Sequence, residues 1–586
     1  MRILISAFRM LAVLAAFSFA ALAQDSPSAP VSNAALTPAV SLPAPAATAE
    51  APPAGPALTL NDVLDRVVDR EHAFMAQMHH MHPMIETYLQ ELGNLSDGSS
   101  TPVSDQYFLG RLDMTGGADD VSFIGQPGFG HRMLARLTGT YALQFLPLGF
   151  AQMVVVDADL QKKNYDFTYV RREFLGEVRC IVIDVQPKAE LETAHFKGRI
   201  WVEDQNYNIV RFNGTYDLQP QVNSFFHFDS WRLNLSSGVW LPAYIYTEES
   251  GLKTGLAKTL HFKAQTRLWG YDLQGLNRKD EFTEILVDSP DTIKDQSDAS
   301  ADATPVFAER LWQRQAEDNA IERLQKIGLV SPPGEVDRIL STVVNNLIVT
   351  NNLDLQTDVR CRVLLTSPLE SFTIGHTIVI SRGLLDVLPD EAALAMVLAH
   401  ELSHIVLAHP FDTKLAFNDR LFFPDEQTFR RLDFKRNAGD EAAADRKALE
   451  LLKNSPYKNK IANAGLFLEA LQQKAPDLPR LIRPHLGNRF ASAKAVRMAA
   501  MLASAPPLDE NKLDQIAALP LGGRIKVDPW SDRVELSKAR PVALVSAHEK
   551  MEFEITPFFP YLTRLSTGGE KVALTTSPPP SQNVSK

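Results

Sequence analysis

The sequence predicts a multidomain α+β protein, in which an N-terminal antiparallel β-rich domain is followed by a mainly helical domain with a small sheet. Between residues 101 and 287, apolar residues alternate or form short runs rich in β-branched and aromatic side chains, separated by turn residues. Beyond residue 305, apolar residues recur mainly at helical spacing. The 586 residues are 45% hydrophobic and 22% charged, which is enough material for several domains with substantial cores.

Composition divides the chain further. We expect a signal peptide at 1–23, a disordered Ala/Pro/Ser-rich tether at 24–57, a helical segment at 58–100, the antiparallel β domain at 101–287, an acidic linker at 288–304, the helical domain at 305–505, and a C-terminal extension with short strands and a disordered tail at 506–586. The 59 basic and 70 acidic residues give a net charge of -11, and no basic run is interleaved with aromatics. We therefore expect no nucleic-acid partner.

The first residues have the layout of a secretory signal. Arg2 and Arg9 flank an apolar run that ends in Ala21-Leu22-Ala23. This pattern predicts cleavage before Gln24 and export of the mature protein. The alternative is an uncleaved N-terminal membrane anchor. The apolar run is shorter than a usual transmembrane helix, but a span of this length is not impossible.

The helical segment at 58–100 begins at Thr59 with an apolar stripe at helical spacing. Its expected continuation carries His72, Met75, Met78, His79, His80, Met81, His82 and Met84. Thioether and imidazole ligands suit copper, but methionines at this spacing more often form an adaptable helix face, and we favour that interpretation.

The β domain is expected to be a curved antiparallel sheet of seven or more strands. The strand pattern over 174–204 resembles the half-barrel of periplasmic lipoprotein carriers and related sensors. Such a concave sheet could bind a lipid or a peptide, or it could serve only as a docking domain. Cys180 lies in this domain and Cys361 in the next, so two buried free thiols are favoured over a bridge.

The chemistry of the chain centres on His400-Glu401-Leu-Ser-His404, an H-E-x-x-H pattern in an expected helix that Asp390 begins and Pro410 stops. Residues four apart return to nearly the same helix face, so the two imidazoles can converge on one metal ion with Glu401 beside them. Two neutral imidazoles and a carboxylate are the first half of a hydrolytic zinc site.

A second expected helix, opening at Asn437, carries Glu441 and Asp445 one turn apart. Glu441 could complete a His2Glu zinc set, and Asp445 could accept the second N–H of a ligating histidine. The alternative is a solvated acidic face. His409 lies five residues beyond His404 and is expected in a structural or supporting role rather than on the metal. Leu407 and Pro410 exclude a metzincin, which needs Gly and His there.

These motifs resemble the M48 group of zinc metallopeptidases, which use H-E-x-x-H and a downstream E-x-x-x-D. Glu370 to Leu385 is also similar to the element that precedes the zinc helix in that family, so the likeness covers roughly Phe307 to Ala505. It implies a zincin-like domain of the gluzincin type with one Zn2+ per chain. The metal ligands would be His400, His404 and Glu441, with Glu401 as the catalytic base and Asp445 behind the ligands.

The resemblance carries two further expectations. The strand Thr377, Ile378, Val379, Ile380 would be the sheet edge along which substrate backbone lies, although His376 stands where the family usually has a second glycine. Ile482 to Arg489 resembles the family's H-P-x-x-x-x-R element, with Arg483 in place of the histidine and His485 two residues later. Either residue could stabilise the oxyanion, and a structural role is the alternative.

We therefore expect an exported zinc endopeptidase, periplasmic or secreted, that hydrolyses peptide bonds of unfolded or envelope proteins and acts in cell-envelope protein quality control. Peripheral membrane association is a further expectation. The competing hypothesis is a non-catalytic or latent periplasmic binding protein whose β domain recognises lipoproteins or misfolded envelope proteins.

Overall fold

The structure is a computed structural model that describes residues 59–94, 100–115, 119–124, 150–188, 195–217, 227–253, 259–271, 305–355, 357–410, 425–492, 496–503, 505, 525–527, 534–536 and 553–565. The chain forms two units, Met1–Ala57 and Leu58–Lys586. The predicted signal peptide, tether and acidic linker lie outside the described residues, as does most of the C-terminal extension.

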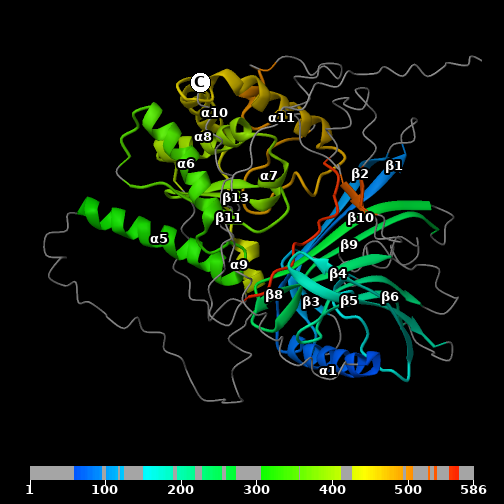
Figure 1. Cartoon of the computed structure of the whole chain (residues 1–586). Coiled ribbons are helices and arrows are strands. Elements are labelled where there is room, and N and C mark those ends of the chain that lie inside the picture. The colour runs from blue at the N-terminus through cyan, green and yellow to red at the C-terminus, as the bar shows by residue number, and fades with distance from the viewer. Residues whose placement is uncertain are drawn as a thin grey trace, which may run out of the picture. The chain divides into compact units, whose positions relative to one another are not determined.

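A ten-stranded antiparallel sheet forms the first part of the second unit, with the order β3-β2-β1-β10-β9-β8-β7-β6-β5-β4 (Figure 1). The strands are β1 (Met84–Asn94), β2 (Ser100–Asp113), β3 (Asp119–Ser122), β4 (Tyr165–Leu175), β5 (Val178–Pro187), β6 (His195–Glu203), β7 (Ile209–Asp217), β8 (Phe228–Ser236), β9 (Val239–Lys253) and β10 (Thr259–Trp269). This sheet and the helices that follow confirm the predicted α+β class.

One face of this sheet packs against helix α1 (Leu60–Met78). Thr59 and Asp62 form a capping box at the start of α1, and Val63, Leu64 and Val67 are buried. The methionines at 78 and 81 are also buried in this apolar cluster, which agrees with a packing role.

The expectation of helix over the whole of 58–100 is wrong, because residues 84–94 form β1. Pro83 cannot continue a helix that would need its N–H. The alternation expected of a strand is hidden because both faces of β1 are covered: Ile85 and Leu89 face the α1 side, while the side chains of Glu86 and Tyr88 are buried on the other.

The second part of the unit is mainly helical. Its elements are α5 (Pro305–Ile327), α6 (Glu335–Thr350), β11 (Arg360–Leu364), β12 (Ser371–Ile374), β13 (Thr377–Ser381), α7 (Arg382–Val387), α8 (Glu391–Val406), α9 (Asp425–Arg431), α10 (Ala438–Lys453), η4 (Lys458–Lys460), α11 (Ile461–Lys474), α12 (Ala499–Leu502), β14 (Ile525–Val527) and β15 (Val534–Leu536). The small sheet has the order β11-β13-β12.

The expected substrate edge is therefore wrong, since Thr377–Ser381 is the central strand. It pairs in parallel with β11 and antiparallel with β12, so its own amides and carbonyls are occupied on both sides. The two outer strands of this sheet are β11 and β12. Residues 329–331 form hydrogen bonds with the end of β11, so β12 is the more open edge among the described residues. Gly375, at φ +56°, makes the turn between β12 and β13, and the adjacent His376 lies 3.7 Å from the carboxylate of Glu317.

Buried polar contacts join the large sheet to the helical part. The Glu86 carboxylate on β1 accepts hydrogen bonds from Ser367 and from the Arg382 guanidinium. Asp105 on β2 accepts the backbone N–H groups of Arg480 and Leu481.

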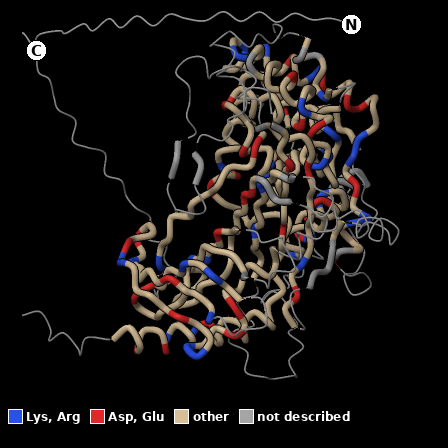
Figure 2. The backbone as a smooth tube through the Cα atoms, turned by 90° about the vertical axis from the view of Figure 1, so that its right-hand side faces the viewer, with Lys and Arg blue, Asp and Glu red and all other residues tan. Residues whose placement is uncertain are grey.

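No helix among the described residues is long and apolar enough to cross a bilayer. Figure 2 shows Lys and Arg interspersed with Asp and Glu along the described backbone.

Candidate metal centre

Helices α8 and α10 lie side by side and carry the H-E-x-x-H and E-x-x-x-D residues (Figure 1). The Asp390 carboxylate caps α8 by accepting the Ala393 N–H, and Asn437 caps α10 by accepting from Gly439 and Asp440. Buried small residues, including Ala444, allow α10 to pack closely against its neighbours. The local capping signals thus fix where each functional side chain leaves its helix.

The structure brings His400, His404 and Glu441 together in one buried cluster. The His400 Nε2 and His404 Nε2 atoms are 3.1 Å apart. The Glu441 carboxylate oxygens lie 3.4 Å from His400 Nε2 and 3.4 Å from His404 Nε2. Ligands of a tetrahedral zinc ion, with bonds of about 2.0–2.1 Å, are separated by about 3.3 Å. The two 3.4 Å distances belong to different oxygens of Glu441, Oε2 toward His400 and Oε1 toward His404, and one ligand atom from each of the three residues lies within 4.8 Å of the others. This spacing is close to what such an ion requires.

Three buried side-chain atoms at the cluster form no hydrogen bond: Glu441 Oε1, His400 Nδ1 and Asp445 Oδ1. Burying a carboxylate oxygen such as Glu441 Oε1 unpaired is costly. A divalent cation between the two imidazoles and this carboxylate would satisfy it. The donor set of two nitrogens and one oxygen also suits zinc.

The second nitrogen of each imidazole faces a neighbouring side chain. Asp445 Oδ1 lies 2.9 Å from His400 Nδ1, and His409 Nδ1 lies 2.8 Å from His404 Nδ1. These contacts orient the rings so that both Nε2 atoms point into the cluster. Asp445 and His409 thus lie where a supporting role, as expected from the sequence, would place them.

The Glu401 carboxylate lies beside the cluster and is fully hydrogen-bonded. Ser371 Oγ and Thr373 Oγ1 on β12 donate to it over 2.6 and 2.7 Å, and Arg497 Nη2 donates over 2.7 Å. Burial acts to raise the pKa of Glu401, but Arg497 and the two imidazoles outweigh burial and hold this pKa below its ordinary value. Glu401 is therefore ionised and able to accept a proton.

Arg497 is the site residue that the sequence analysis missed. Its Nε donates to Glu441 over 2.7 Å and lies 3.1 Å from His400 Nε2, while its Nη1 lies 3.3 Å from the Ser371 carbonyl oxygen. The H-P-x-x-x-x-R pattern, placed over 483–489, assigned the arginine to the exposed Arg489. The same spacing ending at Arg497 begins at Ala491, which lacks the histidine that made the first register attractive.

The two expected oxyanion residues lie elsewhere. The His485 ring stacks on Tyr107 of the large sheet, with ring centroids 5.6 Å apart, and its backbone N–H donates to Glu370. Burial lowers the pKa of His485 to about 4, so the ring is neutral at neutral pH. Arg483 is exposed. The structure therefore assigns the position beside Glu401 to Arg497 in place of either residue.

The imidazoles differ in their affinity for a proton. Burial opposes protonation of both rings, but at His400 the carboxylates of Asp445 and Glu441 outweigh burial and raise the pKa. At His404 burial prevails and the pKa is lowered. Burial also opposes ionisation of Glu441, yet Arg497 and the imidazoles hold its pKa well below the ordinary value. A metal ion would thus meet an ionised carboxylate, and a proton would compete with it more strongly at His400 than at His404.

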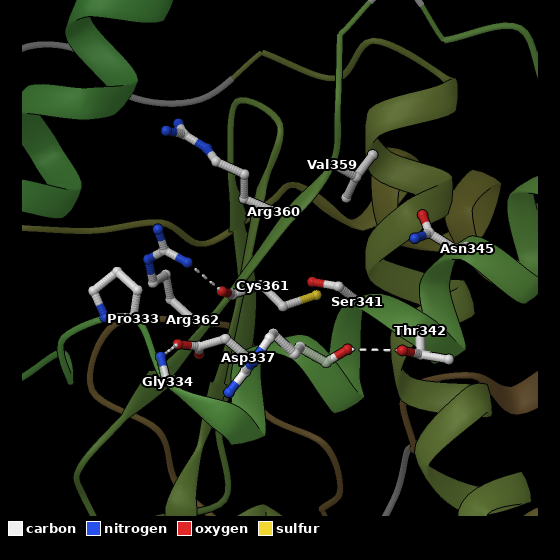
Figure 3. Close-up of a pocket in the computed structure, with 11 residues that line it drawn as sticks. Pro333, Gly334, Asp337, Ser341, Thr342, Asn345, Val359, Arg360, Cys361 and Arg362 are labelled. Atoms are coloured by element: carbon white, nitrogen blue, oxygen red, sulfur yellow. Dashed lines mark hydrogen bonds between the residues drawn. The ribbon is translucent and has the colours of Figure 1, made fainter.

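A separate hollow of about 480 Å³ lies between the start of α6 and β11 (Figure 3). Its lining residues include Asp337, Arg338, Cys361 and Arg362, and none of them belongs to the metal cluster. The Asp337 carboxylate accepts the Gly334 N–H and so caps α6.

Both cysteines, Cys180 and Cys361, are free and buried, as expected.

Comparisons with known proteins cover different parts of the chain. A DUF1329 family protein from Desulfovibrio piger is 10% identical in a structural match that covers 37% of this chain and 95% of that chain, with a TM-score of 0.17. In the Pseudomonas aeruginosa MucA/MucB complex, a chain is 9% identical in a match covering 36% of this chain and 94% of that chain, with a TM-score of 0.13. No curated protein matches the sequence.

Residues 336–419 match Peptidase family M48. The matched stretch runs from α6 to just beyond α8 and includes the H-E-x-x-H residues, whereas Glu441 on α10 lies past its end. Two of the three cluster residues, His400 and His404, lie in this stretch, and the cluster could hold a metal ion. This chain therefore contains a segment, residues 336–419, that is similar to peptidase family M48.

Proposed function

We propose that this protein is a zinc-dependent endopeptidase. The observation that supports this most strongly is the convergence of His400, His404 and Glu441: the two Nε2 atoms are 3.1 Å apart, and each lies 3.4 Å from one of the two oxygens of the Glu441 carboxylate. Zinc bound there would polarise the scissile carbonyl and make its water acidic enough to attack at neutral pH. The three side chains would be its protein ligands, and Asp445 would orient His400.

Glu401 is the proposed general base. Its carboxylate accepts the proton of the attacking water and then delivers it to the leaving amine. Ser371 and Thr373 hold the carboxylate in place, and Arg497 keeps it ionised in a buried setting. Glu401 also follows His400 directly in α8, so the base and the metal ligands are fixed by one rigid element.

The proposed substrate edge is β12, in place of β13. The Glu370 carbonyl accepts the Ser381 N–H of β13, so by alternation the carbonyls of Ser371 and Thr373 point away from β13. These two carbonyls accept hydrogen bonds from Arg497 and Arg436. An extended substrate would donate its amides to the same carbonyls and would have to replace these arginine contacts.

Two substitutions test the assignment in the full chain. Glu401→Gln should retain zinc and lose about 100-fold or more of the cleavage of an unfolded protein such as casein, because it removes the base without removing a ligand. Glu441→Ala should lose zinc far more readily than Asp445→Ala, and Glu450→Gln, an exposed change on the same helix, is the matched control. Undiminished cleavage by Glu401→Gln, or full zinc occupancy in both Glu441→Ala and Asp445→Ala, would overturn the proposal.

Export and substrate are further parts of the proposal. The N-terminal sequence supports cleavage before Gln24 and a periplasmic or secreted location, with unfolded or envelope proteins as substrates in envelope quality control. N-terminal sequencing of the fractionated protein tests the cut. The competing function is a latent or non-catalytic binding protein, and it predicts that casein remains intact with zinc present and equally intact with chelator.

A further inference from the structure

Residues 553–565, called here the C-terminal segment, cross the face of the large sheet that lies opposite α1 (Figure 1). They belong to no helix or strand. Their contacts begin at Gln90 on β1, continue over β10, β9 and β8, and reach the β4–β5 turn at Leu562. The last contacts are those of Arg564 at the end of β6 and of Leu565 with Asn234 on β8. This segment thus crosses the strands instead of adding to an edge of the sheet.

The sheet binds the backbone of this segment through side chains. The Gln90 amide donates from Nε2 to the Phe553 carbonyl oxygen over 2.5 Å, and its Oε1 accepts the Ile555 N–H over 2.8 Å. A side-chain amide used in this way replaces the paired donor and acceptor of a neighbouring strand. The Tyr244 hydroxyl accepts the Phe558 N–H over 3.2 Å. Backbone contacts of this kind do not depend on the sequence of the bound segment.

Charged pairs add sequence selectivity at both ends. Glu554 forms an ion pair with Lys263, whose side chain is only 2% exposed. Ten residues later, Arg564 donates to Glu203 over 2.7 Å and to Asp204 over 3.3 Å. The side chains of Lys263 and Glu203 are buried. Lys263 also lies 3.9 Å from Glu248, and Glu203 also accepts N–H groups of the turn that follows it, so Glu554 and Arg564 complete a charge pairing that the sheet itself supplies only in part.

Apolar anchors lie between these charges, but the fit is incomplete. Phe553, Ile555 and Leu562 are buried, whereas Phe558 and Tyr561 remain 57% and 65% exposed. A segment selected only to complete a core would bury its largest aromatics. At Gly176, which has φ +66°, a Cβ atom would lie 2.5 Å from the Leu562 backbone, so the turn is shaped to admit a chain there.

We propose that this sheet face is a binding surface for an extended polypeptide, and that the C-terminal segment is its displaceable resident ligand. The partner is an unstructured polypeptide segment with an acidic residue between two apolar anchors and a basic residue about ten positions further on. Polypeptide backbone, apolar pockets and one charge of each sign together match this chemistry. The proposal does not depend on proteolysis and applies to the metal-free protein.

The test measures binding of a fluorescein-labelled peptide with the sequence of residues 553–565 to the full chain. Ile555→Asp in the protein removes an anchor and weakens the resident segment, so this variant should bind the peptide at least tenfold more tightly than the wild type. A peptide with Lys in place of Glu554 should bind at least tenfold more weakly, and Lys263→Glu combined with Ile555→Asp should restore it. Binding of a scrambled peptide with equal affinity, or no binding to the folded variant, would overturn the proposal.

A second measurement uses only the wild-type chain, in case Ile555→Asp does not fold. Amide hydrogen exchange should show the Ile555 and Phe558 N–H groups exchanging at least tenfold faster than the amides of β8 and β9, because the segment detaches without unfolding the sheet. Exchange of these amides only together with the sheet amides would show that the segment is a permanent part of the fold, and would refute its role as a displaceable ligand.

Discussion

Replacing Arg497 by Met tests whether the guanidinium and a metal ion neutralise the same carboxylates. Arg497 is 8% exposed and donates to Glu441 and Glu401, each over 2.7 Å. Met has a similar length but no charge, so the metal-free variant leaves two buried carboxylates without their cation. Removing one partner of a buried ion pair costs about 3–5 kcal/mol. We expect the metal-free variant to lose stability on this scale.

A bound metal ion changes this balance. A divalent ion on Glu441 would neutralise the carboxylate that Arg497→Met leaves unpaired. The stability that the ion restores to the variant appears as additional binding free energy for the ion. If the ion restores as little as about 1.4 kcal/mol of this stability, the Kd for the ion falls tenfold. The Arg497→Met variant should therefore bind zinc at least about tenfold more tightly than the wild type, while its turnover falls because Glu401 loses the charge that keeps it ionised.

The assay is competition for zinc against a chelating indicator, together with thermal unfolding with and without zinc. Arg382→Met is the matched control, since Arg382 is also half-buried and pairs with a buried carboxylate, but that carboxylate is Glu86 on β1. It should destabilise the protein without tightening zinc binding. Zinc affinity that is unchanged or weaker in Arg497→Met, or equally tighter in both variants, would refute this reasoning.

Three other predictions concern the rest of the fold. Burial raises the pKa of Asp105 to about 6, so the folded protein retains a proton that the unfolded chain loses above about pH 4. The free energy of unfolding, measured with urea, should therefore fall by about 3 kcal/mol as the pH rises from 4 to 7. The Asp105→Asn variant should not show this change. Glu86→Gln should cost about 3 kcal/mol or more, against less than about 1 for Asp318→Asn, whose side chain is 58% exposed; similar losses in urea unfolding would contradict this. Burial raises the pKa of Cys180 to about 12 and of Cys361 to about 11, so an aromatic disulfide reagent should label them only after unfolding.

The parts of the site that could be predicted from the sequence are those set by local rules. Asp390 and Asn437 act as helix caps, which depend on a few neighbouring residues, and these caps fix the faces of α8 and α10. The spacing of His400 and His404 follows from helical periodicity alone. Only the choice of Glu441 required a guess about two helices packing together, and the spacing of its carboxylate to both imidazoles agrees with that choice.

The errors arise where pairing is not local. Strand order in the small sheet depends on which segments pair with each other, and this is not set by local sequence. The four residues of β12 are too few to show a clear strand pattern between Glu370 and Gly375. The alternation of β1 is hidden because both of its faces are buried. Arg497 reaches the site from a segment more than fifty residues beyond Glu441, and no local rule relates a single arginine to a distant carboxylate.

A path of hydrogen bonds and short backbone stretches runs from the C-terminal segment on the large sheet to the start of β12 in the helical part. Gln90 contacts the C-terminal segment and donates to the Tyr88 hydroxyl, which donates to Asp105. Asp105 accepts the Leu481 N–H, and the Leu481 carbonyl accepts the Leu369 N–H, two residues before the serine that donates to Glu401.

Each member of this path is held by a named donor and acceptor, so a shift of the sheet face is resisted by, and transmitted through, the segment that precedes β12. Contact alone is not coupling, which requires two arrangements of the path with different energies. Occupied and vacant states of the sheet face would supply them, because Gln90 loses both backbone partners when residues 553–565 leave. A binding event on the large sheet would then reach the Glu401 carboxylate without any ligand entering the cluster of His400, His404 and Glu441.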